Sequence, residues 1–170
     1  MKILLNKLLP YITEENRFGF RSWKELPSNI LTTARFLEDK GLKLDVKVQE
    51  VFKKDDFNDV DIVVSWVSVA DGLYEGLDYL RVAKKLGLKT VLILFDDWDG
   101  FSKEILEDYS FVDFAIRRWD IEHNLLNVIN KIKGMKYDSY GFVFREKYKV
   151  IDLGEKIYNH NSLSHLKSSR

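Results

Sequence analysis

The chain has 170 residues, enough for one domain with an appendage, and its 45% apolar and 14% aromatic content can build a buried core. Lysine plus arginine and aspartate plus glutamate both number 27, so the basic excess of a nucleic-acid binder is absent. Cysteine is also absent, which excludes disulfides, cysteine-ligated zinc and cysteine-ligated iron–sulfur clusters from this chain. With no signal peptide and no apolar run near ~20 residues, we expect a cytoplasmic protein without a membrane partner.

Segments with strand character alternate with helical segments over the first 134 residues. Strands are expected at residues 2–5, 42–51, 60–67, 90–95 and 111–116, and helices at residues 27–41, 73–86, 102–106 and 120–134. Residues 90–95 (TVLILF) form a nearly continuous apolar run, which predicts a strand buried on both faces. Residues 42–51 alternate apolar and charged side chains, which indicates a strand near an edge.

This alternation predicts an α/β fold with right-handed crossovers. We expect a Rossmann-like (flavodoxin-like) parallel sheet of five strands, in the order 2-1-3-4-5, with helices on both faces. Residues 140–152 alternate around a charged turn and predict a C-terminal β-hairpin. The expected domains are therefore a Rossmann-like domain at residues 1–134 and a hairpin with linker at residues 135–170.

Ligands of open α/β sheets bind beyond the carboxyl ends of the strands. Ser65, Ser68, Asp71 and Gly72 follow the third strand and could meet the polar tail of a ligand, with ordinary turn chemistry as the alternative. Tryptophans also fall at strand ends, where they suit a large flat ligand or a protein surface, with core closure as the alternative. These tryptophans are Trp66, Trp98 and Trp119.

The loop after the fourth strand is acidic. Asp96, Asp97 and Asp99 could hold Mg²⁺ through oxygen ligands, or could be solvated carboxylates that cap the next helix. We expect Arg117 and Arg118 to pair with this loop. The three histidines are scattered and predict no metal site by spacing. The dinucleotide GxGxxG, P-loop and GxSxG motifs are missing, and the acidic positions of a phosphoacceptor receiver domain are not acidic here.

The order and spacing of several segments resemble the N-terminal cobalamin (B12)-binding domain that precedes the radical SAM domain in two-module enzymes. Residues 2–10 (KILLNKLLP) resemble its opening strand, which ends in Asn-Pro-Pro, and residues 26–41 (LPSNILTTARFLEDKG) resemble its Pro-led first helix. Residues 61–72 (DIVVSWVSVADG) resemble its third strand and Ser-containing exit, and residues 89–106 occupy the place of its fourth strand and following helix. Residues 111–129 resemble its fifth strand-to-helix passage.

The resemblance continues to the end of the chain. Residues 141–152 resemble the hairpin that leads to the catalytic barrel, and residues 165–170 (HLKSSR) resemble the segment just before the cluster cysteines. The resemblance implies a cobalamin cofactor on the carboxyl-end rim and a radical SAM catalytic domain, in cis or in trans, as partner. The iron–sulfur cluster and S-adenosylmethionine would belong to that domain, so we expect this chain alone not to be catalytic.

Strand-end chemistry and the resemblance together predict the cofactor-binding residues. These are Asn6, Ser65, Trp66, Ser68, Asp71, Gly72, Asp96, Asp97, Trp98, Gly100, Arg118 and Trp119. The family's glycine pair after the fourth strand is replaced here by residues 95–97 (FDD). This replacement motivates an alternative hypothesis, a degenerate Rossmann-like substrate-recognition or protein-interaction domain that does not bind cobalamin.

Overall fold

The computed structural model describes residues 1–8, 28–49, 53–68, 72–94, 100–117 and 120–154. In these residues one sheet of seven strands runs in the order β2-β1-β3-β4-β5-β6-β7. The strands are β1 (Lys2–Leu8), β2 (Lys43–Gln49), β3 (Ile62–Val67), β4 (Lys89–Leu94), β5 (Phe114–Arg117), β6 (Phe142–Glu146) and β7 (Lys149–Asp152). The helices are α1 (Ser28–Asp39), α2 (Leu73–Lys85), α3 (Phe101–Asp108) and α4 (Ile121–Ile132), with a 3₁₀ turn, η3 (Lys54–Phe57).

The first five strands are parallel and follow the order predicted from the sequence. The strand predicted to lie near an edge, β2, is the outer strand on its side. The connection predicted between β2 and β3 contains η3, where the backbone N–H of Lys53 donates to Asp56 Oδ2 at 2.8 Å. The α/β architecture is therefore confirmed.

The predicted sheet of five strands is wrong in one respect, because the hairpin is not a separate appendage. Strand β6 pairs antiparallel with β5, with Phe144 opposite Phe114, and β7 pairs with β6. Without this addition the edge of β5 would present unpaired N–H and C=O groups. Phe142 and Phe144 also belong to the buried core, so the hairpin completes a mixed sheet.

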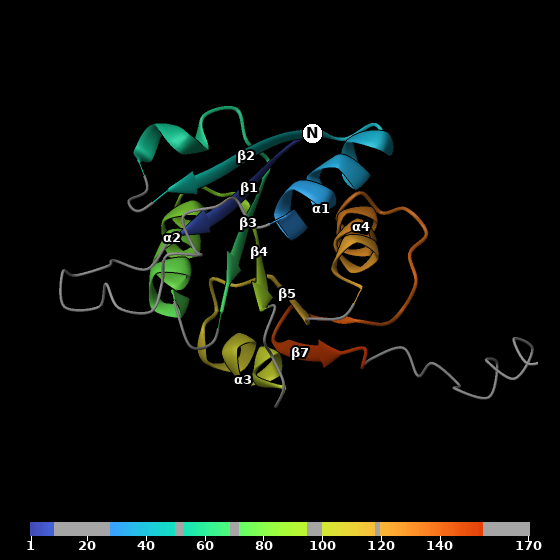
Figure 1. Cartoon of the computed structure of the whole chain (residues 1–170). Helices are drawn as coiled ribbons and strands as arrows, with labels where there is room; N and C mark the ends of the chain where they lie inside the picture. The colour runs from blue at the N-terminus through green and yellow to red at the C-terminus, as the bar shows by residue number, and fades with distance from the viewer. Residues whose placement is uncertain (9–27, 50–52, 69–71, 95–99, 118–119, 155–170) are drawn as a thin grey trace, which may run out of the picture.

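Two helical layers cover the sheet, with α1 and α4 on one face and α2 and α3 on the other (Figure 1). Strand β3 shows how the sequence divides between them, because successive side chains point to opposite faces. Ile62, Val64 and Trp66 pack with α1 and α4, whereas Val63 and Val67 pack with α2 and α3. Both faces of the central strands are thus buried, as their continuous apolar runs predict.

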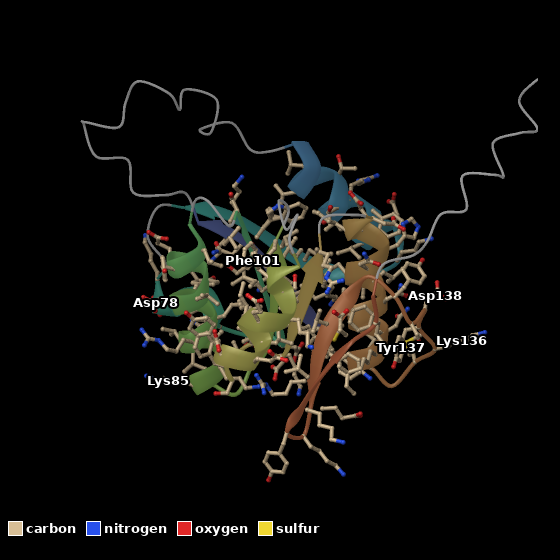
Figure 2. The ribbon with its side chains drawn as sticks, turned by 90° about the horizontal axis from the view of Figure 1, so that it is seen from below. Asp78, Lys85, Phe101, Lys136, Tyr137 and Asp138 are labelled. Atoms are coloured by element: carbon tan, nitrogen blue, oxygen red, sulfur yellow. The ribbon has the colours of Figure 1, made fainter. Side chains whose placement is uncertain are left out.

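The segment between α4 and β6 is tied to the hairpin by aromatic contacts. Lys131 Nζ lies 3.9 Å from the ring centroid of Phe144 and 4.9 Å from that of Tyr137, a cation–π arrangement. Tyr137 also packs on Phe142, and Figure 2 shows it beside the hairpin strands.

No helix in the described ranges is long and apolar enough to cross a membrane.

Candidate functional site

A pair of buried polar side chains lies near the carboxyl ends of the central strands β1 and β3. Asn6 and Ser65 are direct neighbours in the register of the two strands, and both are fully buried. The order in which strands are added to the sheet reverses here, because β1 leads through α1 to β2 on one side and β3 leads through α2 to β4 on the other. Such a topological switch point is where open α/β sheets bind ligands.

These two side chains have unused hydrogen-bonding capacity. Among the described residues, neither Oδ1 nor Nδ2 of Asn6 has a hydrogen-bond partner, and neither does Ser65 Oγ. Burying such a group unpaired costs about 1–3 kcal/mol, so the great majority of buried polar groups are paired. The Asn6 amide can donate and accept, and so can the Ser65 hydroxyl. The pair is therefore suited to a ligand group that carries both donors and acceptors.

Helix α2 closes over Ser65 at a glycine. A Cβ added at Gly76 would lie 2.8 Å from Ser65 Oγ and 2.4 Å from Val67 Cγ1, so only glycine lets the helix approach β3 this closely. Gly76 was not among the sequence candidates. The available signal was a glycine inside an otherwise regular helical pattern, which often has a packing reason.

The opposite face of the same strand ends carries Lys7 and Trp66. One residue beyond the Asn6–Ser65 pair on each strand, they point toward α1 and α4. Lys7 is 5% exposed, and burial lowers the pKa of its ammonium group from the usual value. Trp66 is 1% exposed and packs in the core, as the core-closure alternative expects. Lys7 escaped sequence analysis because a lysine in a strand is usually a solvated position.

Other predicted cofactor-binding residues fall into two groups. Ser68 is buried at 6% exposure, and Gly72 and Gly100 are the N-cap residues of α2 and α3. Both glycines have a left-handed φ, near 80°, which explains the residue type at these positions. The remaining members lie outside the described residues, so their role stays a prediction: Asp71, Asp96, Asp97, Trp98, Arg118 and Trp119.

Charged residues near the carboxyl ends of the strands pair with neighbouring side chains. The guanidinium of Arg117 donates to Asp152 of β7 at 2.5 Å, a partner that sequence analysis did not foresee. His123 Nδ1 lies 2.6 Å from Asp120 Oδ1, three residues earlier on α4. Within the described ranges, no cluster of three or more His, Cys, Asp or Glu side chains could hold a metal ion. Asp99 of the proposed magnesium loop lies outside those ranges.

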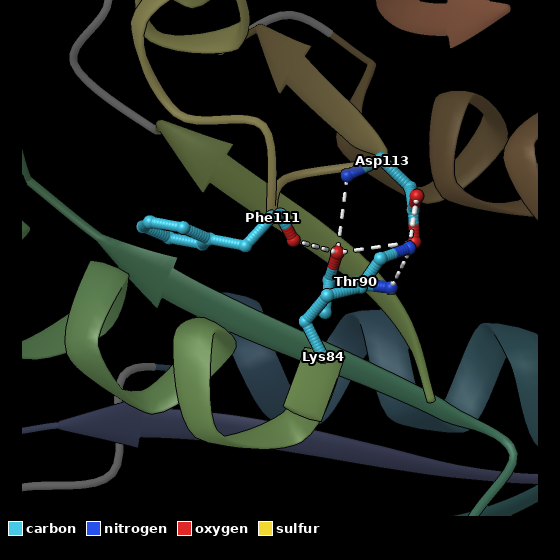
Figure 3. Close-up of polar contacts among 4 residues, drawn as sticks. All are labelled: Lys84, Thr90, Phe111 and Asp113. Carbon is cyan, nitrogen blue, oxygen red and sulfur yellow. Dashed lines mark hydrogen bonds and ion pairs between the residues drawn. The ribbon is translucent and has the colours of Figure 1, made fainter. Parts of the chain in front are cut away.

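At the amino ends of β4 and β5, the buried polar side chains form a hydrogen-bonded network (Figure 3). Thr90 Oγ1 donates to the carbonyl of Phe111 at 2.6 Å and accepts from the Asp113 N–H at 3.0 Å. The Asp113 carboxylate accepts from the Thr90 N–H at 3.1 Å and from Lys84 Nζ at 2.5 Å. Each buried polar atom of this network has a partner, which fits a structural role rather than a ligand site.

Comparison with protein-family models found no match, and no curated protein matches the sequence. Among solved structures, the fold is similar to the radical S-adenosylmethionine methyltransferase TsrM from Kitasatospora setae, a structure with its tryptophan substrate and a SAM analogue bound. The TM-score is 0.62 at 13% sequence identity, over 92% of this chain and 30% of that chain. At this identity the similarity establishes the fold, and the chain spans less than a third of the methyltransferase.

Proposed function

We propose that this chain is a cobalamin-binding-like module of a radical SAM enzyme. The observation that carries the proposal is the buried Asn6–Ser65 pair at the topological switch point, whose side-chain atoms are unpaired among the described residues. A fold shared with part of a radical SAM methyltransferase supports it, as does the order of sequence segments that resembles the cobalamin-binding family.

The residues present fit the tail of such a cofactor. Asn6 would donate through Nδ2 and accept through Oδ1, and the Ser65 hydroxyl would do either, so a tail with mixed donors and acceptors would use all three atoms. Gly72 and Gly100 begin the helices that follow β3 and β4 and keep side chains away from this edge. Cobalamin would supply methyl or radical group transfer, carried out with a separate radical SAM domain.

The test is retention of the cofactor by the purified chain. The protein is mixed with hydroxocobalamin and desalted, and its visible spectrum is recorded. We expect corrinoid bands near one equivalent for the wild type and a clear loss for Asn6→Leu and Ser65→Ala. Asn58→Leu, the same change as the first at an exposed position, is the matched control and should retain the cofactor.

A colourless wild-type protein would overturn the cobalamin proposal. That outcome would favour the alternative of a degenerate Rossmann-like domain that recognises a substrate or a protein. Retention that is equal in all variants would also count against it, because the Asn6–Ser65 pair would then play no part in binding.

A further inference from the structure

Strand β2 is the outer strand on its side of the sheet, and no strand in the described part of the chain pairs with its outer edge. It is seven residues long, as is its neighbour β1. An edge of this length presents a row of N–H and C=O groups that can pair with another strand. Lysines on an edge usually oppose such pairing, and β2 carries Lys43 and Lys47. A strand that adds here must therefore accommodate both lysines.

The two faces of β2 differ in character. Leu44 and Val46 pack against the core that lies under α1. Asp45 and Lys47 point to the opposite face, where Lys47 Nζ lies 2.6 Å from Asp56 Oδ1 of η3. The Lys47 ammonium has three donors, so it can bind a second carboxylate while it keeps Asp56. An added strand must match this division, with apolar side chains on one face and charged side chains on the other.

A second copy of β2 matches this division in an antiparallel register centred on Val46. Opposite side chains of an antiparallel pair lie on the same face, so Val46 meets Val46 and Asp45 meets Lys47 of the second copy. The two-fold axis creates the Asp45–Lys47 pair twice. A register centred on residue 45 would oppose Asp45 to Asp45, and one centred on residue 47 would oppose Lys47 to Lys47. Like charges directly opposite are destabilising, so the register centred on Val46 is favoured.

Helix α1 presents an exposed leucine toward the same edge. Thr33 faces α4, because its Oγ1 donates to Glu122 Oε1 at 3.1 Å. Leu31 lies about 160° around the helix from Thr33 and therefore points away from α4. Since α4 packs on β5 and α1 packs on β2, that direction leads beyond the outer edge of β2. Leu31 is 47% exposed, and the α1 helix of a second copy would bury part of it.

We propose that the outer edge of β2 is a self-association surface, where a second copy of this chain adds its own β2 antiparallel about a two-fold axis at Val46. The two sheets would then continue into one another, with the two α1 helices side by side on one face. The partner is a second copy because β2 is complementary to itself in this register, in both charge and apolar pattern. The pairing requires no corrinoid, so the inference goes beyond the proposed cofactor role.

The experiment compares two charge variants of the full chain by sedimentation velocity. Wild type should form dimers whose fraction rises with concentration. Asp45→Lys opposes two lysines across the axis, and Lys47→Glu opposes two acidic groups. Each variant alone should raise the dimer dissociation constant about tenfold or more. An equimolar mixture of the two should restore association, because opposite charges then meet in both pairs.

The matched control makes the same charge change elsewhere. Asp108→Lys alters an exposed residue of α3, a helix that packs on β5, β6 and β7 at the other side of the sheet. It should leave the dimer dissociation constant unchanged.

A single cysteine tests the register, because the chain has none of its own. In the proposed pairing Val46 lies opposite Val46, with the two Cα atoms about 4.5–5.5 Å apart, a separation that a disulfide spans. Val46→Cys should therefore form a disulfide-linked dimer on mild oxidation. Lys43→Cys, on the same strand, is the control, because its two copies would lie about 20 Å apart.

Each outcome decides the inference. Dimers that weaken in both charge variants and return in their mixture support the surface, and selective oxidation of Val46→Cys supports its register. A wild-type chain that stays monomeric up to about 100 µM overturns the inference, as do dimers that neither charge variant weakens. Equal oxidation of Val46→Cys and Lys43→Cys would also overturn the pairing, because it indicates random collision.

The test does not depend on one variant or on the cofactor. If Lys47→Glu does not fold, because it loses the contact with Asp56, the effect of Asp45→Lys and the two cysteine variants decide the outcome. Because no cobalamin is present, the result is independent of cofactor retention.

Discussion

Buried polar groups are arranged differently at the two ends of the parallel strands, the amino ends and the carboxyl ends, which we call the amino edge and the carboxyl edge of the sheet. At the amino edge, the side chains of Thr90, Asp113 and Lys84 satisfy one another and the adjoining backbone. Near the carboxyl edge, Asn6 and Ser65 are fully buried, with side-chain atoms unpaired among the described residues. Because a paired network stabilises whereas an unpaired group destabilises the free protein, we expect the first set to serve the fold and propose that the second serves a ligand.

The largest effect should come from Asp113→Ala. This change removes the acceptor of Lys84 Nζ and of the Thr90 N–H, at a carboxylate only 15% exposed. We expect the free energy of unfolding to fall by about 2–4 kcal/mol, measured by urea denaturation. Asp78→Ala is the control, because Asp78 pairs with Arg81 on the outer face of α2 at 60% exposure (Figure 2). Asp78→Ala should lower the free energy of unfolding by no more than about 0.5 kcal/mol. Equal losses would mean that the amino-edge network contributes nothing special.

A matched pair of hydroxyl deletions tests the comparison itself. Thr90→Val removes one donor and one acceptor from the amino edge, and should lower the free energy of unfolding by about 1–3 kcal/mol. Ser65→Ala removes a hydroxyl that has no partner among the described residues, and should leave the stability of the free chain unchanged or raise it by up to about 1 kcal/mol. Denaturation curves of both variants give the two signs. A destabilising Ser65→Ala would contradict the assignment of this hydroxyl to a ligand.

The sequence predicts the strands well because burial dictates their composition. A strand covered on both faces is apolar along its buried length, as residues 91–94 of β4 are, and a strand at an edge alternates, as β2 does. The strand character of β6 and β7 was equally visible. The sequence did not predict which edge of the sheet these two strands join, because periodicity describes one strand, whereas pairing depends on a neighbour distant in the sequence.

The candidate site was only partly predictable, for a related reason. Asn6, Ser65 and Trp66 stand out as polar or aromatic residues at strand ends, so position along the chain was sufficient to select them. The burial of Lys7 and the close approach of Gly76 to Ser65 depend on which element covers each face. That information is held by the packing of helices α1 and α2 on the sheet, and no local pattern contains it.

Gly76→Ala should have a smaller effect, made of two opposing parts. Alanine gains about 1 kcal/mol over glycine in a helix interior. The added Cβ would meet Val67 Cγ1 at 2.4 Å, and such overpacking costs about 1–3 kcal/mol. We expect a net loss of about 1 kcal/mol in the free energy of unfolding, measured by urea denaturation. In a Val67→Ala background, where the clashing Cγ1 atom is absent, Gly76→Ala should cost less. A net gain in stability would show that α2 does not sit this close to β3.

The subtlest effect is a pH slope at Lys7. Burial lowers the pKa of this lysine in the folded protein, so between that pKa and 10.5 the unfolded chain binds more protons than the folded one. Its contribution to stability must therefore rise with pH across that window. The difference in the free energy of unfolding between Lys7→Met and wild type, measured by urea denaturation from neutral pH upward, should accordingly shift in favour of wild type as pH increases.

Two comparisons isolate that slope. Burial, then Asp56 and Asp45, raise the pKa of Tyr79, whose contribution to stability falls above pH 10. This fall occurs in wild type and variant alike and cancels in the difference. Lys89→Met removes an exposed lysine and is the control for the loss of one lysine charge from the chain. A Lys7→Met difference that moves the other way with pH would contradict the lowered pKa of Lys7 in the folded protein.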